Sequence, residues 1–452
     1  MPANRLRTSP DGVGISACFT RARICVLGLH SAAMFAEAIS RLSPRSPKLQ
    51  SAAAKVLGDR RLLWGIVGLV AVQRVLADLP VFLPSAADAY AFIDAGRQAL
   101  SNPGGIYAHS AAEIAAGRTW VITWPPPQIV IAIPFTALPS PVDVWVWVGT
   151  NALMAVAGLV LLYRAIAPPR ATWTLPISVL VVLCFTPLFE DVRLGQRGGL
   201  LLLLAGGAMF SVRRHPAWAG VLTGLGTSIK FYPAAMALSI APRQWLRFTI
   251  ALVATATATL LATFIPFGSP IQYLTKVLIP VSVGNAAATR DCFQNSTPLL
   301  FSRLVGGASF SMINSSGVWK EVTLVPWHLP WLAQLLTYLT VATLFGATVW
   351  AAWRSGWAQP YSMSAAFALG ALVPGDVYTY QFIPMLPLTL VLVLKAIEQH
   401  RWGIAALAGA AELVLISSPC ALVFPGLWTI AGLAIFGVAV TQAALFRGRA
   451  LR

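Results

Sequence analysis

The chain has 452 residues, of which 57% are hydrophobic and only 10% are charged, and its mean hydropathy is +0.72. A soluble domain is about 25% charged because it needs a wetted surface. The composition therefore excludes a cytosolic enzyme, a secreted disulfide scaffold and a disordered chain. It indicates an all-α polytopic membrane protein.

The net charge of +17 comes from Lys and Arg residues that stand in short clusters between apolar stretches. This arrangement is typical of cytoplasmic loops rather than of a nucleic-acid-binding surface, so we expect no nucleic-acid partner. Basic residues are dense before the first apolar stretch, and we interpret residues 1–58 as a cytoplasmic N-terminal arm without a fixed fold. The five cysteines form no CxxC pair and predict neither a metal site nor a disulfide framework.

The apolar stretches predict a bundle of about ten membrane-spanning helices, because about 20 apolar residues cross a hydrocarbon core of about 30 Å. The basic clusters set the direction of each span, with both termini cytoplasmic and a tail at 447–452. The spans are predicted at 62–83, 144–165, 175–189, 200–212, 248–267, 329–353, 362–373, 382–394, 404–423 and 428–445, within a transmembrane domain over 59–446.

Two further apolar runs do not fit a simple span. Ile129–Leu138 is too short and follows three prolines, so we expect a re-entrant or interfacial helix. Ala217–Ile240 has basic clusters beside both ends, which predicts a helix broken at Pro233 that rises and returns.

Two long segments, 85–128 and 268–328, are expected on the non-cytoplasmic face of the plasma membrane. The first contains an amphipathic stretch, Asp88–Ala99, that predicts a helix lying on the membrane surface. Clustered acidic residues on otherwise apolar external loops make an active site at this surface plausible. The acids assigned to this face are Asp88, Asp94, Glu113, Asp143, Glu190, Asp191, Asp291, Glu321 and Asp376.

Asp88 is the strongest catalytic candidate, because it follows the first span where a carboxylate can meet a substrate arriving from the outer leaflet. The alternative is that Asp88 is the N-cap of the helix that follows it. Asp94, further along the same helix, is a candidate acceptor-binding residue or a solvated surface charge.

Lys230 is the second candidate, because it stands inside an apolar run. An unpaired cation in lipid costs about 2.5–3.5 kcal/mol, so such a residue is a functional candidate by default. Lys230 can bind an anion such as a lipid phosphate. The alternatives are snorkelling to the surface or a structural pair with Glu190 or Asp191.

Three other polar groups on the expected outer face can either bind a ligand or have only a structural or solvated role. Arg193, Gln196 and Arg197 suit phosphate oxygens but also a capped turn. The run Arg290–Ser296, which includes Asn295, can line an acceptor cleft or be solvated. Tyr378 and Tyr380 can stack on a sugar, or belong to the interfacial aromatic belt.

Five motifs in this order resemble glycosyltransferase family 87, over about Leu62 to Leu394. These are Asp88 and Tyr90 with Gly105-Ile106-Tyr107, Trp124-Pro125-Pro126, Leu194-Gly195-Gln196, Ile229-Lys230-Phe231-Tyr232-Pro233, and Gln294-Asn295-Ser296. Two segments depart from the family pattern, Arg197-Gly198-Gly199 and Asp376–Tyr380.

The resemblance implies an integral-membrane transferase of the GT-C type that uses polyprenyl-phosphate sugars. The family includes mycobacterial α-mannosyltransferases and an arabinofuranosyltransferase. By the resemblance, Asp88 matches the catalytic carboxylate of the first external loop. Lys230, Arg193, Gln196, Tyr232 and Arg290 are then expected to bind the donor phosphate, and Asp94, Asn295, Tyr378 and Tyr380 the acceptor or sugar.

The function expected from these observations is inverting sugar transfer, with mannose favoured, from a lipid-linked donor to a lipid or glycan hydroxyl. Asp88 acts as the general base and Lys230, helped by Arg193 or Arg290, stabilises the leaving phosphate. With these cations present neither a metal nor another cofactor is required. The alternatives are arabinofuranosyl transfer, a transporter or flippase for a lipid-linked sugar, and a non-catalytic scaffold.

Overall fold

The computed structural model describes residues 55–82, 86–116, 122–166, 171–280, 294–313, 319–355, 357, 360–374, 377–416 and 426–445. Nearly all of the N-terminal arm, the C-terminal tail, Arg290 and Asp376 lie outside these residues. Within them the chain is helical except for one short hairpin, so the all-α prediction is confirmed.

The N-terminal half forms helices of very different lengths. They are α3 (Arg60–Phe82), α4 (Ala87–Ser101), α5 (Pro103–Ala115), α6 (Pro126–Val130), the 3₁₀ turn η1 (Ile133–Ala137), α7 (Val142–Ile166), α8 (Thr174–Cys184), α9 (Thr186–Leu194), α10 (Gly198–Ser211), α11 (Pro216–Ile229), the 3₁₀ helix η2 (Tyr232–Ser239) and α12 (Pro242–Phe267).

The C-terminal half begins with small elements and continues as helices. They are α13 (Pro270–Tyr273), the π-helical η3 (Leu274–Leu278), α15 (Thr297–Leu304), strands β1 (Phe310–Ile313) and β2 (Trp319–Val322), α16 (Pro330–Arg354), α17 (Pro360–Leu372), η4 (Thr379–Phe382), α18 (Met385–Glu398), α19 (Trp402–Ile416) and α20 (Leu427–Leu445). The strands pair antiparallel, with Phe310 opposite Val322.

Among the described residues, three helices are long and apolar enough to cross a membrane: α7, α12 and α16. A fourth is counted if α8 and α9 form one bent span. The sequence predicted about ten spans. The difference arises because most apolar helices are short: α10 has 14 residues, or about 21 Å, against a core of about 30 Å.

Two predicted segments are broken in ways that position the site. The segment predicted as one span at 175–189 is bent by 59° between α8 and α9 and continues to Leu194. The run 217–240 does break, but the prediction of Pro233 as the break is wrong. The α-helix α11 ends at Ile229, and Lys230 is in an extended conformation before η2 begins.

Glycines allow the central helices to pack closely. A Cβ on Gly199 would lie 2.1 Å from the Asn151 carbonyl oxygen, and one on Gly206 would lie 2.5 Å from the Gly158 carbonyl oxygen. Close approach through small residues is the usual packing device of membrane helices. It holds α10 against α7 and thereby fixes the turn that precedes α10.

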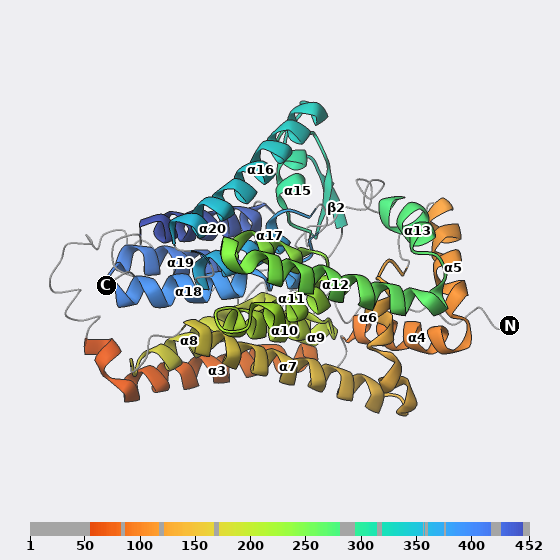
Figure 1. Cartoon of the computed structure of the whole chain (residues 1–452). Coiled ribbons are helices and arrows are strands. Elements are labelled where there is room, and N and C mark those ends of the chain that lie inside the picture. The colour runs from red at the N-terminus through yellow and green to blue at the C-terminus, as the bar shows by residue number, and fades with distance from the viewer. Residues whose placement is uncertain are drawn as a thin grey trace.

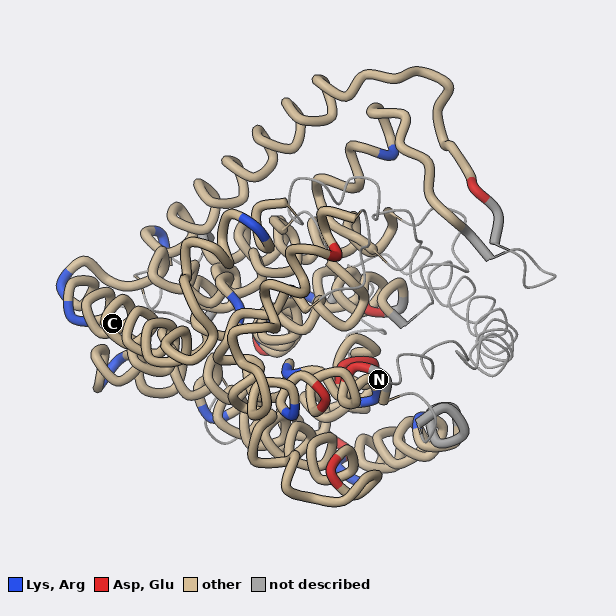
Figure 2. Tube along the Cα trace, turned by 90° about the vertical axis from the view of Figure 1, so that its right-hand side faces the viewer, with Lys and Arg blue, Asp and Glu red and all other residues tan. Residues whose placement is uncertain are grey.

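The long helices α7 and α12 run along the length of the molecule, and α4, α5 and α13 gather at one end of it (Figure 1). The most deeply buried core includes α17 and α18, where Met385, Leu386 and Leu388 are fully buried. Charged residues are short, isolated interruptions of the trace (Figure 2). The few charged side chains that do meet inside the molecule therefore mark candidate functional positions.

Candidate active site

Asp88 lies in the first turn of α4, but it does not cap this helix. The N-cap is Ala86, and no side chain caps the helix start. The alternative interpretation of Asp88 as an N-cap is therefore wrong. Its carboxylate instead accepts a hydrogen bond from Gln196 Nε2 at 2.6 Å, across 108 residues of sequence.

The turn after α9 brings Gln196 to Asp88. Gly195 is left-handed, with φ 73°, and the backbone N–H groups of Gly195 and Gln196 donate to the carbonyls of Val192 and Asp191. This pair of hydrogen bonds is a Schellman helix end, which requires a residue that tolerates positive φ. A Cβ on Gly195 would lie 2.4 Å from Ala89 Cβ, so glycine also lets the turn rest on α4.

Trp147 on α7 fixes the same turn from the other side. Its indole Nε1 donates to the Gly195 carbonyl oxygen at 2.6 Å, and it is buried. The Asp88–Gln196 contact is therefore set by three helices, α4, α7 and α9, and not by flexible loops.

The charges around Asp88 act in opposite directions on its ionisation. Partial burial raises the pKa of this carboxyl above its usual value, and the Gln196 hydrogen bond and the positive charges of Arg197, Lys230 and Arg193 oppose this. One carboxylate oxygen receives Gln196, and no described residue donates a hydrogen bond to the other. A carboxylate oxygen without a donor can accept a proton.

Asp191 is the second carboxylate near the site, and both of its oxygens accept hydrogen bonds from the protein. It is 1% exposed, accepts a hydrogen bond from Asn151 Nδ2 at 3.1 Å, and receives the Gly198 backbone N–H at 3.0 Å on both oxygens. The sequence assigned Asp191 to an external surface, but it lies inside the bundle. Its hydrogen bonds fix the start of α10 and leave it no role as a base.

Arg197 connects several elements beneath Asp88. Its guanidinium, 2% exposed, lies 3.3 Å from the centroid of the Phe92 ring and 5.5 Å from that of Trp124. Its Nη1 donates to the Gln128 carbonyl oxygen at 2.9 Å, and Gln128 Nε2 donates to the Ile229 carbonyl oxygen. Arg197 thus contacts Phe92 of α4 and Gln128 of α6, and Gln128 in turn contacts Ile229, the residue that precedes Lys230.

Lys230 lies at the end of α11 with no ion-pair partner among the described residues. Its ammonium interacts electrostatically with Asp191, Asp88 and Arg197, and it lies 6.0 Å from the centroid of the Tyr380 ring. The alternative of a structural pair is not found, because Lys230 forms no salt bridge with Glu190 or Asp191. A cation held near a candidate base, without a salt bridge of its own, is suited to bind an anion.

Gln294 and Asn295 pair through their backbones with the segment that contains Tyr378. Gln294 pairs with Tyr378 in an antiparallel bridge, and the Asn295 backbone N–H donates to the Val377 carbonyl oxygen at 2.7 Å. Tyr378 and Tyr380 stack with their planes 5° apart and their centroids at 5.7 Å. Asn295, which is buried, and the two tyrosines therefore lie in one unit, next to Lys230 through Tyr380.

Other predicted site residues have different surroundings. Arg193 donates to Glu190, with Nε at 3.1 Å from Oε2, and acts on Asp88 only through its charge. Tyr232 packs its ring on Phe367, with centroids 5.5 Å apart. Asp94 forms an ion pair with Arg97 on the exposed side of α4, so it is not brought to the Asp88 cluster. Arg290 lies outside the described residues.

Several residues that shape the site have no role predicted from the sequence. Asn151, Gln128 and Trp147 hold Asp191, Arg197 and Gly195 respectively, and each is buried. The available signal was a polar residue inside an apolar stretch, which is expensive unless paired. Only the fold shows which partner each one has.

Comparison with known proteins gives one match. The model of glycosyltransferase family 87 matches residues 122–377, which is more than half of the chain. No curated protein and no solved structure matches the chain. The matched range includes the Gln196 turn, Arg197 and Lys230, and it begins after Asp88.

Proposed function

Since the chain belongs to glycosyltransferase family 87 and is a membrane glycosyltransferase, we propose that it transfers a sugar, with mannose favoured, from a polyprenyl-phosphate donor to a lipid or glycan hydroxyl. The reaction inverts the anomeric carbon and takes place on the outer face of the plasma membrane. One observation carries the proposal: Asp88 has one carboxylate oxygen open and lies in the field of Lys230, Arg197 and Arg193.

In the proposed step the acceptor hydroxyl gives its proton to the open oxygen of Asp88. The acceptor oxygen attacks the anomeric carbon, and the bond from that carbon to the phosphate oxygen breaks. The polyprenyl phosphate leaves with the electron pair. A general base typically contributes about 10²–10⁴-fold to such a reaction.

Lys230 is proposed to stabilise the charge that grows on the leaving phosphate. Its ammonium is held by the end of α11 without a competing salt bridge, so it is available to an anion. Stabilising charge where it develops is often the largest single contribution to catalysis. Arg193 assists as a nearby positive charge.

Tyr378, Tyr380 and Asn295 are proposed to contact the sugar or the acceptor. The stacked tyrosine pair presents aromatic rings beside Lys230, and aromatic rings bind the apolar faces of sugars. This assignment places the transferred sugar between the tyrosines and Asp88, with the phosphate toward Lys230.

The test uses the purified full-length protein in lipid vesicles, offered polyprenyl-phosphate mannose and polyprenyl-phosphate arabinofuranose in parallel with a lipid acceptor. We expect one donor to be consumed with formation of a glycosidic bond, and Asp88→Asn to lower kcat by about 10²–10⁴-fold. Glu398→Gln is the matched control, because it changes an exposed carboxylate paired with Lys395, distant from Asp88 in the fold.

An Asp88→Asn protein with wild-type turnover would exclude Asp88 as the base. Binding of both donors without turnover would instead favour the transporter or flippase alternative. Consumption of the arabinofuranose donor alone would keep the mechanism and change the sugar.

A further inference from the structure

A second cluster of cations lies at the far end of the two helices that reach the candidate active site. Helix α10 begins beside Asp191 and ends before Arg214, and α11 begins after His215 and returns to Lys230. At this far end a pocket of about 500 Å³ is lined by Arg214, His215, Pro216, Ala217, Trp218 and Arg247. The length of α10, about 21 Å, separates the pocket from the active site.

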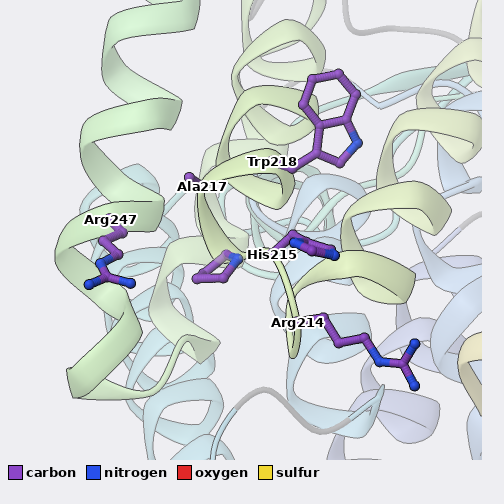
Figure 3. Close-up of a pocket in the computed structure, with 6 residues that line it drawn as sticks. Arg214, His215, Ala217, Trp218 and Arg247 are labelled. Carbon is purple, nitrogen blue, oxygen red and sulfur yellow. The ribbon is translucent and has the colours of Figure 1, made fainter.

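The pocket is formed by the close packing of α11 on α12. A Cβ on Gly220 would lie 2.2 Å from the Phe248 carbonyl oxygen, so only glycine allows this approach. The contact lies one residue beyond Arg247, and it sets Arg247 beside the first turn of α11. In Figure 3, the His215 ring lies between the Arg247 side chain and the Arg214 side chain, which extend to either side of it.

No described carboxylate pairs with the two arginines of the pocket. The sequence contains no Asp or Glu between Asp191 and Asp291. Among the described residues, Arg214 and Arg247 form no salt bridge, and both side chains are exposed. Two unpaired guanidinium groups at one concave site create a positive potential that an anion can neutralise.

Exposed apolar side chains place the pocket at the membrane–water boundary. Trp218 is 57% exposed, Trp245 is 46% exposed and Leu246 is 61% exposed, all close to the arginines in sequence. Tryptophan is enriched at the level of the lipid headgroups, with the acyl chains on one side and water on the other. An occupant of the pocket therefore meets the indole of Trp218 together with the two cations.

We propose that this pocket binds the headgroup of an anionic phospholipid in the leaflet opposite Asp88. The phosphodiester lies in the positive potential of the two arginines on either side of His215, and a guanidinium group matches the geometry of phosphate oxygens. The acyl chains lie along the exposed apolar surface near Trp218. Basic pockets between membrane helices bind anionic lipid headgroups by this combination of charge and apolar contact.

The test measures lipid retention by native mass spectrometry of the full-length protein, titrated in detergent with phosphatidylglycerol, with phosphatidylcholine and, separately, with soluble glycerol phosphate. We expect phosphatidylglycerol to be retained more tightly than phosphatidylcholine. The double variant Arg214→Gln with Arg247→Gln is expected to weaken phosphatidylglycerol retention by about 25-fold, at about fivefold for each cation near the membrane surface.

The matched control is the double variant Arg60→Gln with Arg61→Gln, which removes two exposed cations from the start of α3, outside the pocket. It is expected to retain phosphatidylglycerol within twofold of the wild type, and thermal unfolding without lipid checks that both variants fold. Equal loss in the control would overturn the proposal, because general surface charge would then explain the binding. Equal retention of both lipids, unchanged retention in the pocket variant, or equally tight binding of glycerol phosphate would also overturn it.

Discussion

The two ends of the α10–α11 helix pair both collect cations, but among the described residues only the end near Asp88 has carboxylates beside them. At the end near Asp88, Lys230 and Arg197 face Asp88 and Asp191. At the other end, Arg214 and Arg247 have no described carboxylate partner. Carboxylates beside cations can supply both a base and charge stabilisation, whereas Arg214 and Arg247 supply positive charge without a base. The same pair of helices is therefore expected to support chemistry at one end and binding at the other.

Removing the Lys230 cation from the end with carboxylates tests this difference between the two ends most strongly. Lys230→Met is expected to lower kcat by about 10²-fold, because the leaving phosphate loses its nearest unpaired positive charge. Lys230→Arg is expected to restore part of this loss. Steady-state kinetics with the consumed donor make the measurement, and Arg61→Met serves as the control for loss of one positive charge.

A Lys230→Met protein with a raised KM and an unchanged kcat would show that Lys230 binds the donor equally in the ground state and the transition state. The two ends would then differ less than proposed, because both would hold anions without contributing to the chemical step.

The second prediction concerns the turn that assembles the end near Asp88. Gly195→Ala is expected to destabilise the protein by about 1–2 kcal/mol, because a Cβ is disfavoured in the left-handed conformation and would lie 2.4 Å from Ala89 Cβ. Activity is expected to fall with it, since Gln196 no longer meets Asp88 correctly. Gly346→Ala is the matched control, because a Cβ there has no neighbour within 4 Å.

Thermal unfolding in detergent, followed by tryptophan fluorescence, compares the two alanine variants. A Gly195→Ala protein as stable and as active as Gly346→Ala would show that the turn after α9 does not determine the geometry of Asp88.

The smallest expected effect is a shift in the pH dependence of transfer. A general base must be ionised, so activity falls as the pH drops through the pKa of Asp88. Burial raises this pKa, so the acidic limb should lie above the usual Asp value of about 3.9. The Gln196 hydrogen bond lowers the pKa, and Gln196→Leu should therefore move the limb upward.

The pH profile of kcat/KM measures this shift, and Glu398→Gln should leave the limb unchanged. A downward shift in Gln196→Leu would contradict the hydrogen bond as a stabiliser of the ionised carboxylate.

The sequence determined the class of the protein and most of its helices, because apolar stretches in a chain with 10% charged residues have few alternatives. It also singled out Asp88 and Lys230, since ionisable groups beside or within apolar runs are costly and therefore conspicuous. It could not fix where helices break. Helix α11 ends at Ile229 rather than at Pro233, because Lys230 is extended and the Gln128 side chain donates a hydrogen bond to the Ile229 carbonyl oxygen.

Only the tertiary structure decided which polar groups meet. Asp88 and Gln196 are 108 residues apart, and the contact exists because Gly195 and Trp147 hold one turn against α4. Asp94 pairs locally with Arg97, three residues further along α4, and only the fold shows that it lies outside the Asp88 cluster. The pocket around Arg247 depends on Gly220 packing against Phe248. Hydrophobic pattern is a local property of the chain, whereas the meeting of charges depends on how helices cross, and that is set by contacts between distant residues.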